Sequence, residues 1–350
     1  MSQPTLHFHT YKTSIRYHIK RVLESKGWSV GEKNSALFSD LNLTLDDEVS
    51  KHFEYKHFLA ELLQKKCPDL QPLTYPINDE NATQVLSKIA LNHYYIDHQY
   101  QKNIPGLKWI LKPSMLNNGD DIKLFNNIEE LKKHFKSTDR LGGDQVIQHY
   151  VAHPALYQGR KFTYRFLALF TNYDGIYLYR QGYVNISAHP FQLEDNFVNR
   201  KVHITNYVLD GELAHITQKL ASDMPHFDTL FNQVLEKVKA CAQALIQKFP
   251  SYLKPQDPKQ LEFFGFDFIL DEAGKLWLLE INQSPDCPVD PDVNLMAPLW
   301  YPYWEAVVGD FVLPMTLGTV PQYHHKDFKQ ILPPRACYSR SKAWLRKFFG

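Results

Sequence analysis

Two apolar runs joined by a short polar turn, residues 262–286 (EFFGFDFILDEAGKLWLLEINQSPD), constrain the fold of this chain more than any other stretch. Aromatic and β-branched residues fill both runs, and the Gly-containing turn at residues 271–274 separates them, which predicts a β-hairpin. Side chains two residues apart on a strand point to the same face, so Glu280 and Asn282 project together. The turn brings Asp267 roughly opposite Glu280. The hairpin is therefore predicted to gather three oxygen-bearing side chains on one face.

Carboxylates that converge in an apolar setting repel one another and are costly to bury unless a cation lies between them. Oxygen ligands of this kind suit Mg²⁺, which takes a few carboxylates together with water and nucleotide phosphates. The alternative is an edge hairpin whose acids face solvent, where most single acidic residues on strands lie. Three such side chains in phase favour the metal site.

Two strands predicted before the hairpin carry cations among apolar residues. In KWILKP (residues 108–113), Lys112 must reach an anion or extend to solvent past its apolar neighbours. In the run GRKFTYRFLAL, Lys161, Thr163 and Arg165 share one face of a strand, and two cations beside a hydroxyl are typical of an anion site. A half-exposed strand with no ligand is the alternative interpretation.

Composition excludes several other classes of protein. The 350 residues carry 39 basic and 38 acidic side chains, so no overall field favours nucleic acid or a membrane surface. The four cysteines are scattered without zinc or redox spacing, which predicts a reduced, cytoplasmic setting. The first ten residues lack the apolar core of a signal peptide, and no apolar run approaches the ~20 residues of a membrane span. The oligomeric state is not predicted.

The sequence FGFDFILDE…KLWLLEINQSP resembles the metal-binding hairpin of the tubulin tyrosine ligase-like family, a branch of the ATP-grasp ligases. Five ordered blocks carry the resemblance over roughly residues 49–286. It implies an α/β fold of the α+β type, an ATP-grasp fold with the nucleotide between its central and C-terminal lobes. The implied parts are an N-terminal α/β lobe (1–50), a central lobe (51–155), a C-terminal lobe with the metal hairpin (156–320) and a tail (321–350).

The resemblance also implies roles for individual residues. ATP contacts fall on Lys56, Lys112, Gly119, Gln148, Tyr150, Val151, Lys161, Thr205 and Asp267. The Mg²⁺ ligands are Asp267, Glu280 and Asn282. Catalytic roles fall on Arg165, Lys161 and Glu280, and contacts to the amino acid or acceptor on Arg165, Arg180, Thr205 and Asn206. In the family, the strand similar to VIQHYV receives adenine on its Gln and on the backbone that follows.

Three positions depart from the family pattern. The loop SMLNNGDDI (residues 114–122) is glycine-rich in the family and closes over phosphates through backbone N–H groups. Here Asn118 stands where a lysine is usual, and Asp121 where a glycine is usual. Thr163 replaces an aspartate, which leaves the choice of substrate open.

The implied reaction is ATP-dependent ligation of an amino acid to a protein through an acyl phosphate, with tubulin as a candidate acceptor. In that reaction an acceptor carboxylate attacks the γ-phosphate, and an amine then attacks the acyl phosphate. Two alternatives stay open: an ATP-grasp ligase acting on a small molecule, and a nucleotide-binding interaction protein that has lost catalysis.

Hydrophobic periodicity predicts the remaining elements. Expected strands cover residues 5–9, 36–43, 73–77, 144–151 and 175–183. Expected helices cover 14–25, 49–66, 82–95, 128–136, 227–249 and 300–311. The basic, aromatic end at 335–350 is either a packed terminal helix or a segment that docks on acidic protein tails or anionic lipid.

Overall fold

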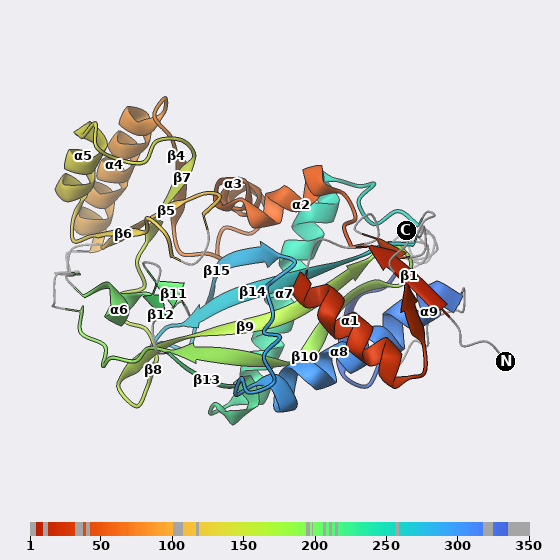
Figure 1. Cartoon of the computed structure of the whole chain (residues 1–350). Coiled ribbons are helices and arrows are strands. Elements are labelled where there is room, and N and C mark those ends of the chain that lie inside the picture. Colours follow the sequence, from red (N-terminus) through yellow and green to blue (C-terminus); the bar gives the residue numbers. More distant parts are fainter. Residues whose placement is uncertain are drawn as a thin grey trace, which may run out of the picture.

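The fold mixes helices with antiparallel sheets, so the predicted α+β class is confirmed (Figure 1). The computed structural model describes residues 5–9, 13–31, 38–39, 43–100, 108–116, 119–193, 197, 199–205, 208–209, 212–213, 216–255, 259–317 and 325–334. The basic, aromatic segment 335–350 lies outside these residues. The division into lobes at the boundaries given above stays a prediction.

The largest sheet of the described chain has seven strands, five of them in the order β13-β10-β9-β14-β15 with antiparallel neighbours. These five are β9 (Arg160–Thr171), β10 (Gly175–Ile186), β13 (Thr217–Leu220), β14 (Leu261–Leu270) and β15 (Leu276–Gln283). Two short strands pair with it from the side, β8 (Leu156–Tyr157) with β9 and β16 (Phe328–Leu332) with β10. The predicted hairpin is thus β14–β15.

A smaller antiparallel sheet lies beside β14–β15 and has the strand order β4-β7-β5-β6 (Figure 1). Its strands are β4 (Thr74–Ile77), β7 (Gln145–His149), β5 (Trp109–Pro113) and β6 (Lys123–Phe125). Helices α4 (Ala82–Tyr100) and α5 (Ile128–Lys136) cover it, and Trp109, Leu111 and Ile147 lie in the core between them. Asn127 caps α5 by accepting from the backbone N–H of Glu130, which explains why this helix begins where predicted.

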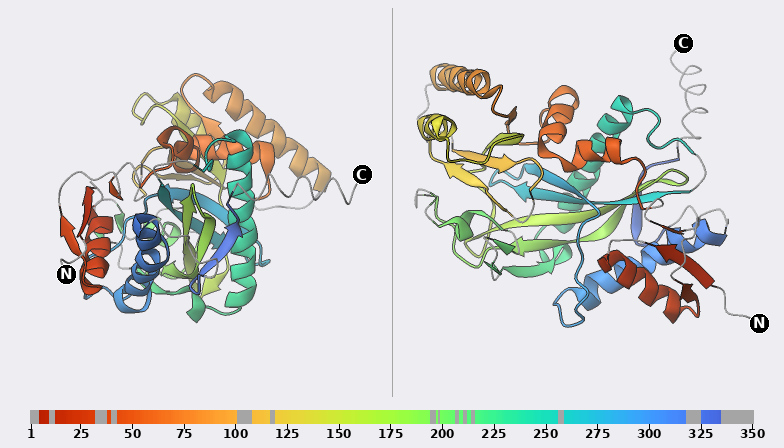
Figure 2. Two further views of the ribbon diagram at one scale, coloured as in Figure 1. Left: turned by 90° about the vertical axis from the view of Figure 1, so that its right-hand side faces the viewer. Right: turned by 45° about the horizontal axis from the view of Figure 1, so that its top comes forward.

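Different helices pack against the two faces of the large sheet. One face packs against α2 (Asp47–Glu54), α3 (Lys56–Lys66) and the long helix α7 (Phe227–Lys248). The other packs against a continuous helical run, η4 (Met296–Trp300), α8 (Tyr301–Val307), η5 (Val308–Val312) and α9 (Leu313–Leu317), as Figures 1 and 2 show. Helix α1 (Thr13–Ser25) packs against α8 and η5 of this run. These helices cover only one end of that face. The open end lies under the smaller sheet.

The remaining elements are short. At the N-terminus, β1 (Thr5–His9) pairs in parallel with β2 (Ser29–Gly31) and β3 (Phe38–Ser39). Near the open end of the large sheet lie α6 (Arg200–His203), β11 (Val208–Leu209) and β12 (Glu212–Leu213) (Figure 1). The 3₁₀ turn η3 (Ala221–Asp223) follows β13 and contacts β10.

Most predicted elements are confirmed, but two sequence predictions are wrong in detail. The single helix expected at residues 49–66 is two helices, because Tyr55 adopts an extended conformation (φ −80°, ψ 117°) and ends α2. The break places Lys56 at the start of α3, where its backbone N–H donates to Ser114 O at 3.3 Å. The helix expected to begin at Trp300 begins at Met296 instead.

Glu262, at the start of the hairpin, is completely buried and joins four separate segments. Its carboxylate accepts hydrogen bonds from Tyr252 Oη (2.6 Å), Ser50 Oγ (2.8 Å) and Gln283 Nε2 (2.5 Å), and from the backbone N–H of Leu45 (3.2 Å). Burial raises the pKa of Glu262 to about 7, against the opposing effect of these donors. The network fixes α2 against β14 and β15.

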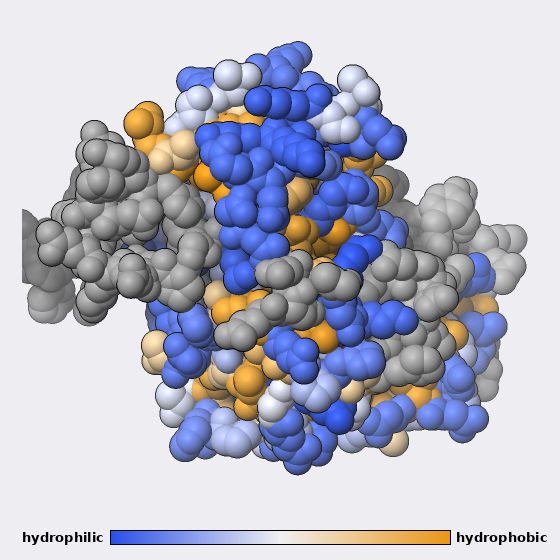
Figure 3. Space-filling view, turned by 90° about the vertical axis from the view of Figure 1, so that its left-hand side faces the viewer, coloured by the Kyte–Doolittle hydropathy of each residue, from blue (hydrophilic) through white to orange (hydrophobic). Residues whose placement is uncertain are grey.

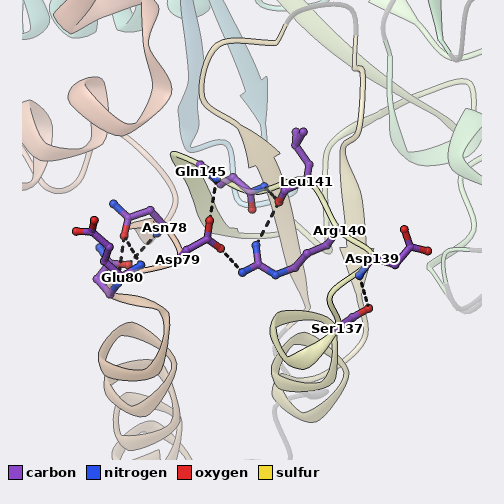
Figure 4. Close-up of polar contacts among 10 residues, drawn as sticks. Asn78, Asp79, Glu80, Ser137, Asp139, Arg140, Leu141 and Gln145 are labelled. Carbon is purple, nitrogen blue, oxygen red and sulfur yellow. Dashed lines mark hydrogen bonds and ion pairs between the residues drawn. The ribbon is translucent and has the colours of Figure 1, made fainter.

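Polar contacts hold the loop before β7 against the end of β4, as Figure 4 shows. Arg140 forms an ion pair with Asp79 and donates to Leu141 O, and Asp79 also accepts from the backbone N–H of Gly143 (3.2 Å). Asp144, which follows this loop, accepts the backbone N–H of Ser114 on its carbonyl oxygen. Through Asp144, these contacts position Ser114, the first residue of the loop expected to cover a nucleotide.

On the face in Figure 3, hydrophilic residues cover much of the described surface, and hydrophobic residues are visible in patches between them. None of the helices in the described residues combines the length and apolar character needed to cross a bilayer.

Candidate active site

A row of charged side chains crosses the large sheet at its open end. Cross-strand register places Glu280 on β15 opposite Asp267 on β14, and Asp267 opposite Arg165 on β9. Arg165 in turn lies opposite Tyr183 on β10. The prediction that Asp267 and Glu280 face one another across the hairpin is confirmed. We call Glu280, Asp267 and Arg165 the charged row.

The charged row is held together by a two-point ion pair. Arg165 Nε donates to Asp267 Oδ1 at 2.6 Å, and Arg165 Nη2 donates to Oδ2 at 2.5 Å. Burial opposes the charge on Arg165, but the contact with Asp267 raises the guanidinium pKa. Burial raises the pKa of Asp267 to about 6 although Arg165 acts to lower it. For Glu280, the cations Lys56, Lys112 and Arg165 outweigh burial and lower the pKa to about 2. Both carboxylates are therefore ionised at neutral pH.

The three expected metal ligands lie together. Asn282 is opposite Gly265, and its Nδ2 donates to Asp267 Oδ2 at 3.2 Å. Two carboxylates and an amide oxygen suit Mg²⁺, which commonly takes one or two protein carboxylates and completes its shell with phosphates and water. Among the described residues no group of three or more His, Cys, Asp or Glu side chains is placed to hold a metal unaided. The donor set thus fits a magnesium ion that arrives with a nucleotide.

Two lysines from other elements face the charged row across one cavity, and a third, Lys161, lies on β9 itself. Lys112 on β5 donates to Gln148 Oε1 (2.9 Å), and Lys56 on α3 donates to Leu116 O (2.9 Å) and lies 3.6 Å from Glu280 Oε2. Burial lowers the pKa of Lys112 to about 8, although Glu280 acts to raise it. Side chains alternate along β5, so Trp109 and Leu111 lie in the core while Lys112 lines the cavity.

Lys161 lies on β9, four residues before Arg165 on the same face of the strand, and is buried. It donates to His203 O at 2.6 Å and to Tyr150 Oη at 3.1 Å, while Tyr150 Oη also contacts His203 Nδ1 at 3.0 Å. Burial, together with the charge of the nearby Lys112, lowers the pKa of Lys161 to about 7. An anion that enters here meets a lysine that gains a proton as it binds.

The segment expected to receive adenine also lines the cavity, through Gln148, Tyr150 and Val151. The side chain of Gln148 is already engaged: Nε2 donates to Thr74 Oγ1 at 2.9 Å, and Oε1 accepts from Lys112. Gln148 therefore orients Lys112 in this structure, and contact with a base would require it to exchange a partner. Ile269 and Leu279 add apolar surface to this part of the cavity.

Two described residues of the loop after β5 have left-handed backbone conformations. Gly119 has φ 76°, and Asp121, where the family has glycine, has φ 50°, in the left-handed region that favours glycine. Asp121 pairs with Lys123 at 2.8 Å and is absent from the cavity lining of the described residues, whereas Gly119 lines it. Arg200 donates to Gly119 O at 3.0 Å. Asn118 lies outside the described residues.

Three of the substrate residues expected from the sequence have different outcomes. Thr205 lines the cavity, and its Oγ1 lies 2.9 Å from Thr163 Oγ1; Asn206 lies outside the described residues. Arg180 is exposed, is not brought to the cavity, and donates from Nε to Lys326 O at 3.0 Å. Side chains alternate between the two faces of a strand, so Arg180 lies on the face of β10 opposite to that of Tyr183. Its side chain therefore points away from the charged row.

Sequence reasoning missed several residues that line the cavity. The most important are Tyr183, Asn185, His203 and Gln218. Period-two alternation from Tyr177 along β10 reaches Tyr183 and Asn185, and this signal would have found both. His203 and Gln218 carry no comparable signal, because only the folded chain places their segments beside β9 and β10.

Comparison with known proteins agrees with this fold and site. The α+β architecture, with a carboxylate hairpin facing Lys112 of the second sheet, is consistent with an ATP-grasp fold. The model of the tubulin-tyrosine ligase family matches residues 80–317, and the chain belongs to that family.

Similar proteins include a probable alpha-tubulin polyglutamylase, Ttll1, from Tetrahymena thermophila (26% identical, over 72% of this chain and 65% of that protein). A probable tubulin polyglutamylase, TTLL2, from Mus musculus is 26% identical over 72% of this chain and 47% of its own length. A tubulin monoglycylase, TTLL3, from Mus musculus is 28% identical over 54% of this chain and 22% of its own length. The chain thus spans less than two thirds of each of these relatives.

Proposed function

We propose that this protein is an ATP-dependent ligase that joins the amine of an amino acid to a carboxylate of a protein. One observation carries the proposal: the charged row and three buried lysines from separate elements converge on a single cavity. Four cations against two carboxylates is a poor arrangement for an empty core and a good one for a polyphosphate. Membership of the tubulin-tyrosine ligase family supports the same assignment.

Different residues of the cavity serve different parts of the proposed reaction. Lys56, Lys112 and Lys161 bind the phosphates of ATP and offset the charge that develops as the acceptor carboxylate attacks the γ-phosphorus. That attack forms a C–O–P bond, breaks the bond to the ADP oxygen and gives an acyl phosphate. Asp267, Glu280 and Asn282 would hold Mg²⁺, which when bound neutralises phosphate charge.

Arg165 has a second task, because one edge of its guanidinium is fixed by Asp267 while the cavity lies on its other side. It stabilises the acyl-phosphate oxygens as the amine attacks the carbonyl carbon and phosphate leaves. Closing the site around both reactants supplies much of the remaining acceleration.

The acceptor we propose is a protein carboxylate, with tubulin as the first candidate, because relatives are named as tubulin polyglutamylases and a tubulin glycylase. We place the reaction in the cytoplasm, where ATP and a reduced environment coexist. Asp121, which prompted the alternative of a protein without catalysis, pairs with Lys123 rather than facing the cavity.

The test incubates the protein with Mg²⁺, ATP, tubulin or cell lysate, and single radiolabelled amino acids. Labelled protein bands together with ADP release are expected. Label confined to small products would replace the protein acceptor with a small molecule, and nucleotide binding without either product would overturn the ligase.

The variant Glu280→Gln removes one carboxylate of the charged row and is expected to lower ADP release by at least about a hundredfold. Glu272→Gln is the matched control, because Glu272 lies exposed in the turn of the same hairpin and pairs only with His153 at 3.8 Å among the described ion pairs. Circular dichroism shows whether both variants fold. Near-normal turnover by Glu280→Gln would contradict the metal assignment.

A further inference from the structure

Helix α3 begins without a capping side chain of its own, and a residue far along the chain takes that place. Tyr55, which precedes the helix, makes no side-chain hydrogen bond to it. The first N–H groups of a helix have no partner within it and must find one elsewhere. Here Lys56 N donates to Ser114 O at 3.3 Å, and His57 N donates to Ser114 Oγ at 3.2 Å. Ser114 therefore caps α3 from a distant part of the sequence.

The side chain of His57 adds a third contact to the same serine. Its Nδ1 lies 2.5 Å from Ser114 Oγ. Burial lowers the pKa of the ring, although Asp144 and Glu61 act to raise it, so the ring is neutral at neutral pH. The other ring nitrogen, Nε2, faces Asp144 Oδ2 at 3.7 Å, which favours the ring proton on Nε2. Nδ1 is then the acceptor for the hydroxyl proton of Ser114.

Ser114 connects three elements at the edge of the cavity. It follows β5 directly, and its own N–H donates to Asp144 O at 3.0 Å, beside the start of β7. Ser114 is 1% exposed, so its polar groups depend on partners inside the protein. It is also the first residue of the loop whose Leu116 and Gly119 line the cavity. The place where His57 holds Ser114 therefore sets where this loop begins.

A serine, a histidine and an aspartate in series are also the groups of a hydrolytic triad. A nucleophilic serine must reach its substrate, but Ser114 is buried and lies outside the cavity lining of the described residues. Its oxygen also accepts the N–H of His57 and so serves the start of α3. The arrangement holds a loop and does not cleave a substrate.

We propose that His57 is a positioning residue for nucleotide binding, which acts through Ser114 to keep the loop after β5 against α3 before a nucleotide arrives. The inference rests on the proposed ligase function, in which this loop covers the phosphates of ATP. A loop that is already held in place loses less conformational freedom on binding, so the ligand binds more tightly. His57 itself is absent from the cavity lining of the described residues, so its effect reaches the nucleotide through the loop.

The test measures the dissociation constant of the Mg²⁺ complex of a non-hydrolysable ATP analogue by isothermal titration calorimetry. His57→Phe keeps an aromatic ring beside Phe58 but removes the acceptor for the Ser114 hydroxyl. We expect it to bind the analogue about tenfold more weakly. His57→Asn retains an acceptor near the place of Nδ1 and should bind within about threefold of wild type. Wild-type affinity in His57→Phe, or an equal loss in His57→Asn, would overturn the inference.

A double substitution shows whether His57 acts through Ser114. Ser114→Ala alone should weaken binding at least as much as His57→Phe, because it also removes the acceptor for His57 N. In the Ser114→Ala background, His57→Phe should then change the affinity by less than about twofold. Losses that multiply would overturn the inference. His52→Phe is the matched control and should keep wild-type affinity, because His52 also stacks on Phe58 but bonds to Glu48 O of its own helix.

Amide hydrogen exchange gives a second measurement if Ser114→Ala does not fold. Without nucleotide, His57→Phe should raise exchange in residues 114–116 by about tenfold, and His57→Asn should leave it near that of wild type. Unchanged exchange in His57→Phe would show that the ring does not hold the loop.

Failure of this inference and failure of the ligase differ in outcome. Labelled protein with ADP release, together with unchanged nucleotide affinity in His57→Phe, leaves the ligase standing and removes the role of His57. Weaker nucleotide binding by His57→Phe in a protein that modifies no acceptor removes the ligase and keeps that role. In an active enzyme, His57→Phe should raise KM for ATP about tenfold and leave kcat within about twofold. A wild-type protein that binds no nucleotide would overturn both.

Discussion

Arg165 and Asp267 lie directly opposite one another on adjacent strands, and two hydrogen bonds of 2.6 and 2.5 Å join their side chains. Because the pair is mostly enclosed, neither charge is adequately hydrated by water, and each depends on the other. The bidentate geometry also fixes the plane of the guanidinium. The site therefore holds one of its two carboxylates in a defined orientation before any ligand arrives.

Asp267→Asn is expected to destabilise the protein by about 3 kcal/mol, because it leaves the Arg165 guanidinium buried without its counter-charge. The double variant Arg165→Met/Asp267→Leu, which removes both charges, is expected to recover much of that loss. Urea unfolding measures both. Glu129→Gln, which breaks an exposed i,i+3 pair with Lys132 on α5, is the control and should cost under about 0.5 kcal/mol. A double variant no more stable than Asp267→Asn would show that the pair itself contributes the stability.

Lys161 is expected to take up protons when nucleotide binds. Burial and the charge on Lys112 lower its pKa to about 7, so at pH 8 most molecules carry the neutral amine. Phosphate beside Lys161 favours the charged form and raises the pKa, so binding at pH 8 takes up close to one proton, about 0.5 to 1. Isothermal titration calorimetry in buffers of different ionisation enthalpy measures this uptake.

Lys161→Met should lose most of that proton uptake, while Lys132→Met on the surface of α5 should keep it. Uptake in Lys161→Met equal to wild type would assign the proton to another group.

His325 joins three elements through two carboxylates and should make stability depend on alkaline pH. Its ring contacts Asp174 and Asp310, each at 3.2 Å, and its side chain is 3% exposed. Burial opposes the charge, but the two carboxylates raise the pKa to about 9. Since this folded-state pKa lies above the value of 6.5 in the unfolded chain, the stabilisation is complete below pH 6.5 and is lost as pH rises through 9.

Urea unfolding at pH 6.5 and at pH 10 gives the change in the free energy of unfolding between these two pH values. After allowance for solvent screening, this change should be about 2 kcal/mol larger in wild type than in His325→Gln. His189→Gln, at an exposed histidine without a carboxylate partner among the described ion pairs, serves as control. Equal pH dependence of the unfolding free energy in wild type and His325→Gln would show that the contacts of His325 with Asp174 and Asp310 do not stabilise the fold.

The hairpin and its metal face were predictable because their signals are local. Asp267 and Glu280 flank one turn, and period-two alternation decides which side chains share a face. The same rule placed Lys112, and it placed Lys161 and Arg165 together. Residues within one strand or one hairpin need no knowledge of the rest of the fold.

What the sequence did not predict depends on contacts between distant segments. The break at Tyr55 interrupts a helical pattern whose apolar spacing runs on without a proline or glycine, and the new helix start is paired with Ser114 nearly sixty residues later. Arg180 was predicted to contact the substrate because its segment is similar to a family motif. Alternation along β10, however, puts Arg180 on the face opposite to that of Tyr183. Gln218 reaches the site only because β13 pairs with β10.

Lys56 is expected to hold the loop after β5 in place. Its Nζ donates to Leu116 O at 2.9 Å and lies 3.6 Å from Glu280, so one lysine connects the loop to the charged row. Lys56→Met removes both contacts and should increase amide hydrogen exchange in residues 114–116 by about tenfold, with severalfold weaker binding of an ATP analogue. Lys66→Met, at the exposed end of the same helix, is the control. Hydrogen–deuterium exchange with mass spectrometry measures the loop, and calorimetry measures the nucleotide. Weaker nucleotide binding with unchanged exchange would mean that Lys56 acts on phosphate alone, because a residue that anchors the loop must alter its opening before any ligand is present.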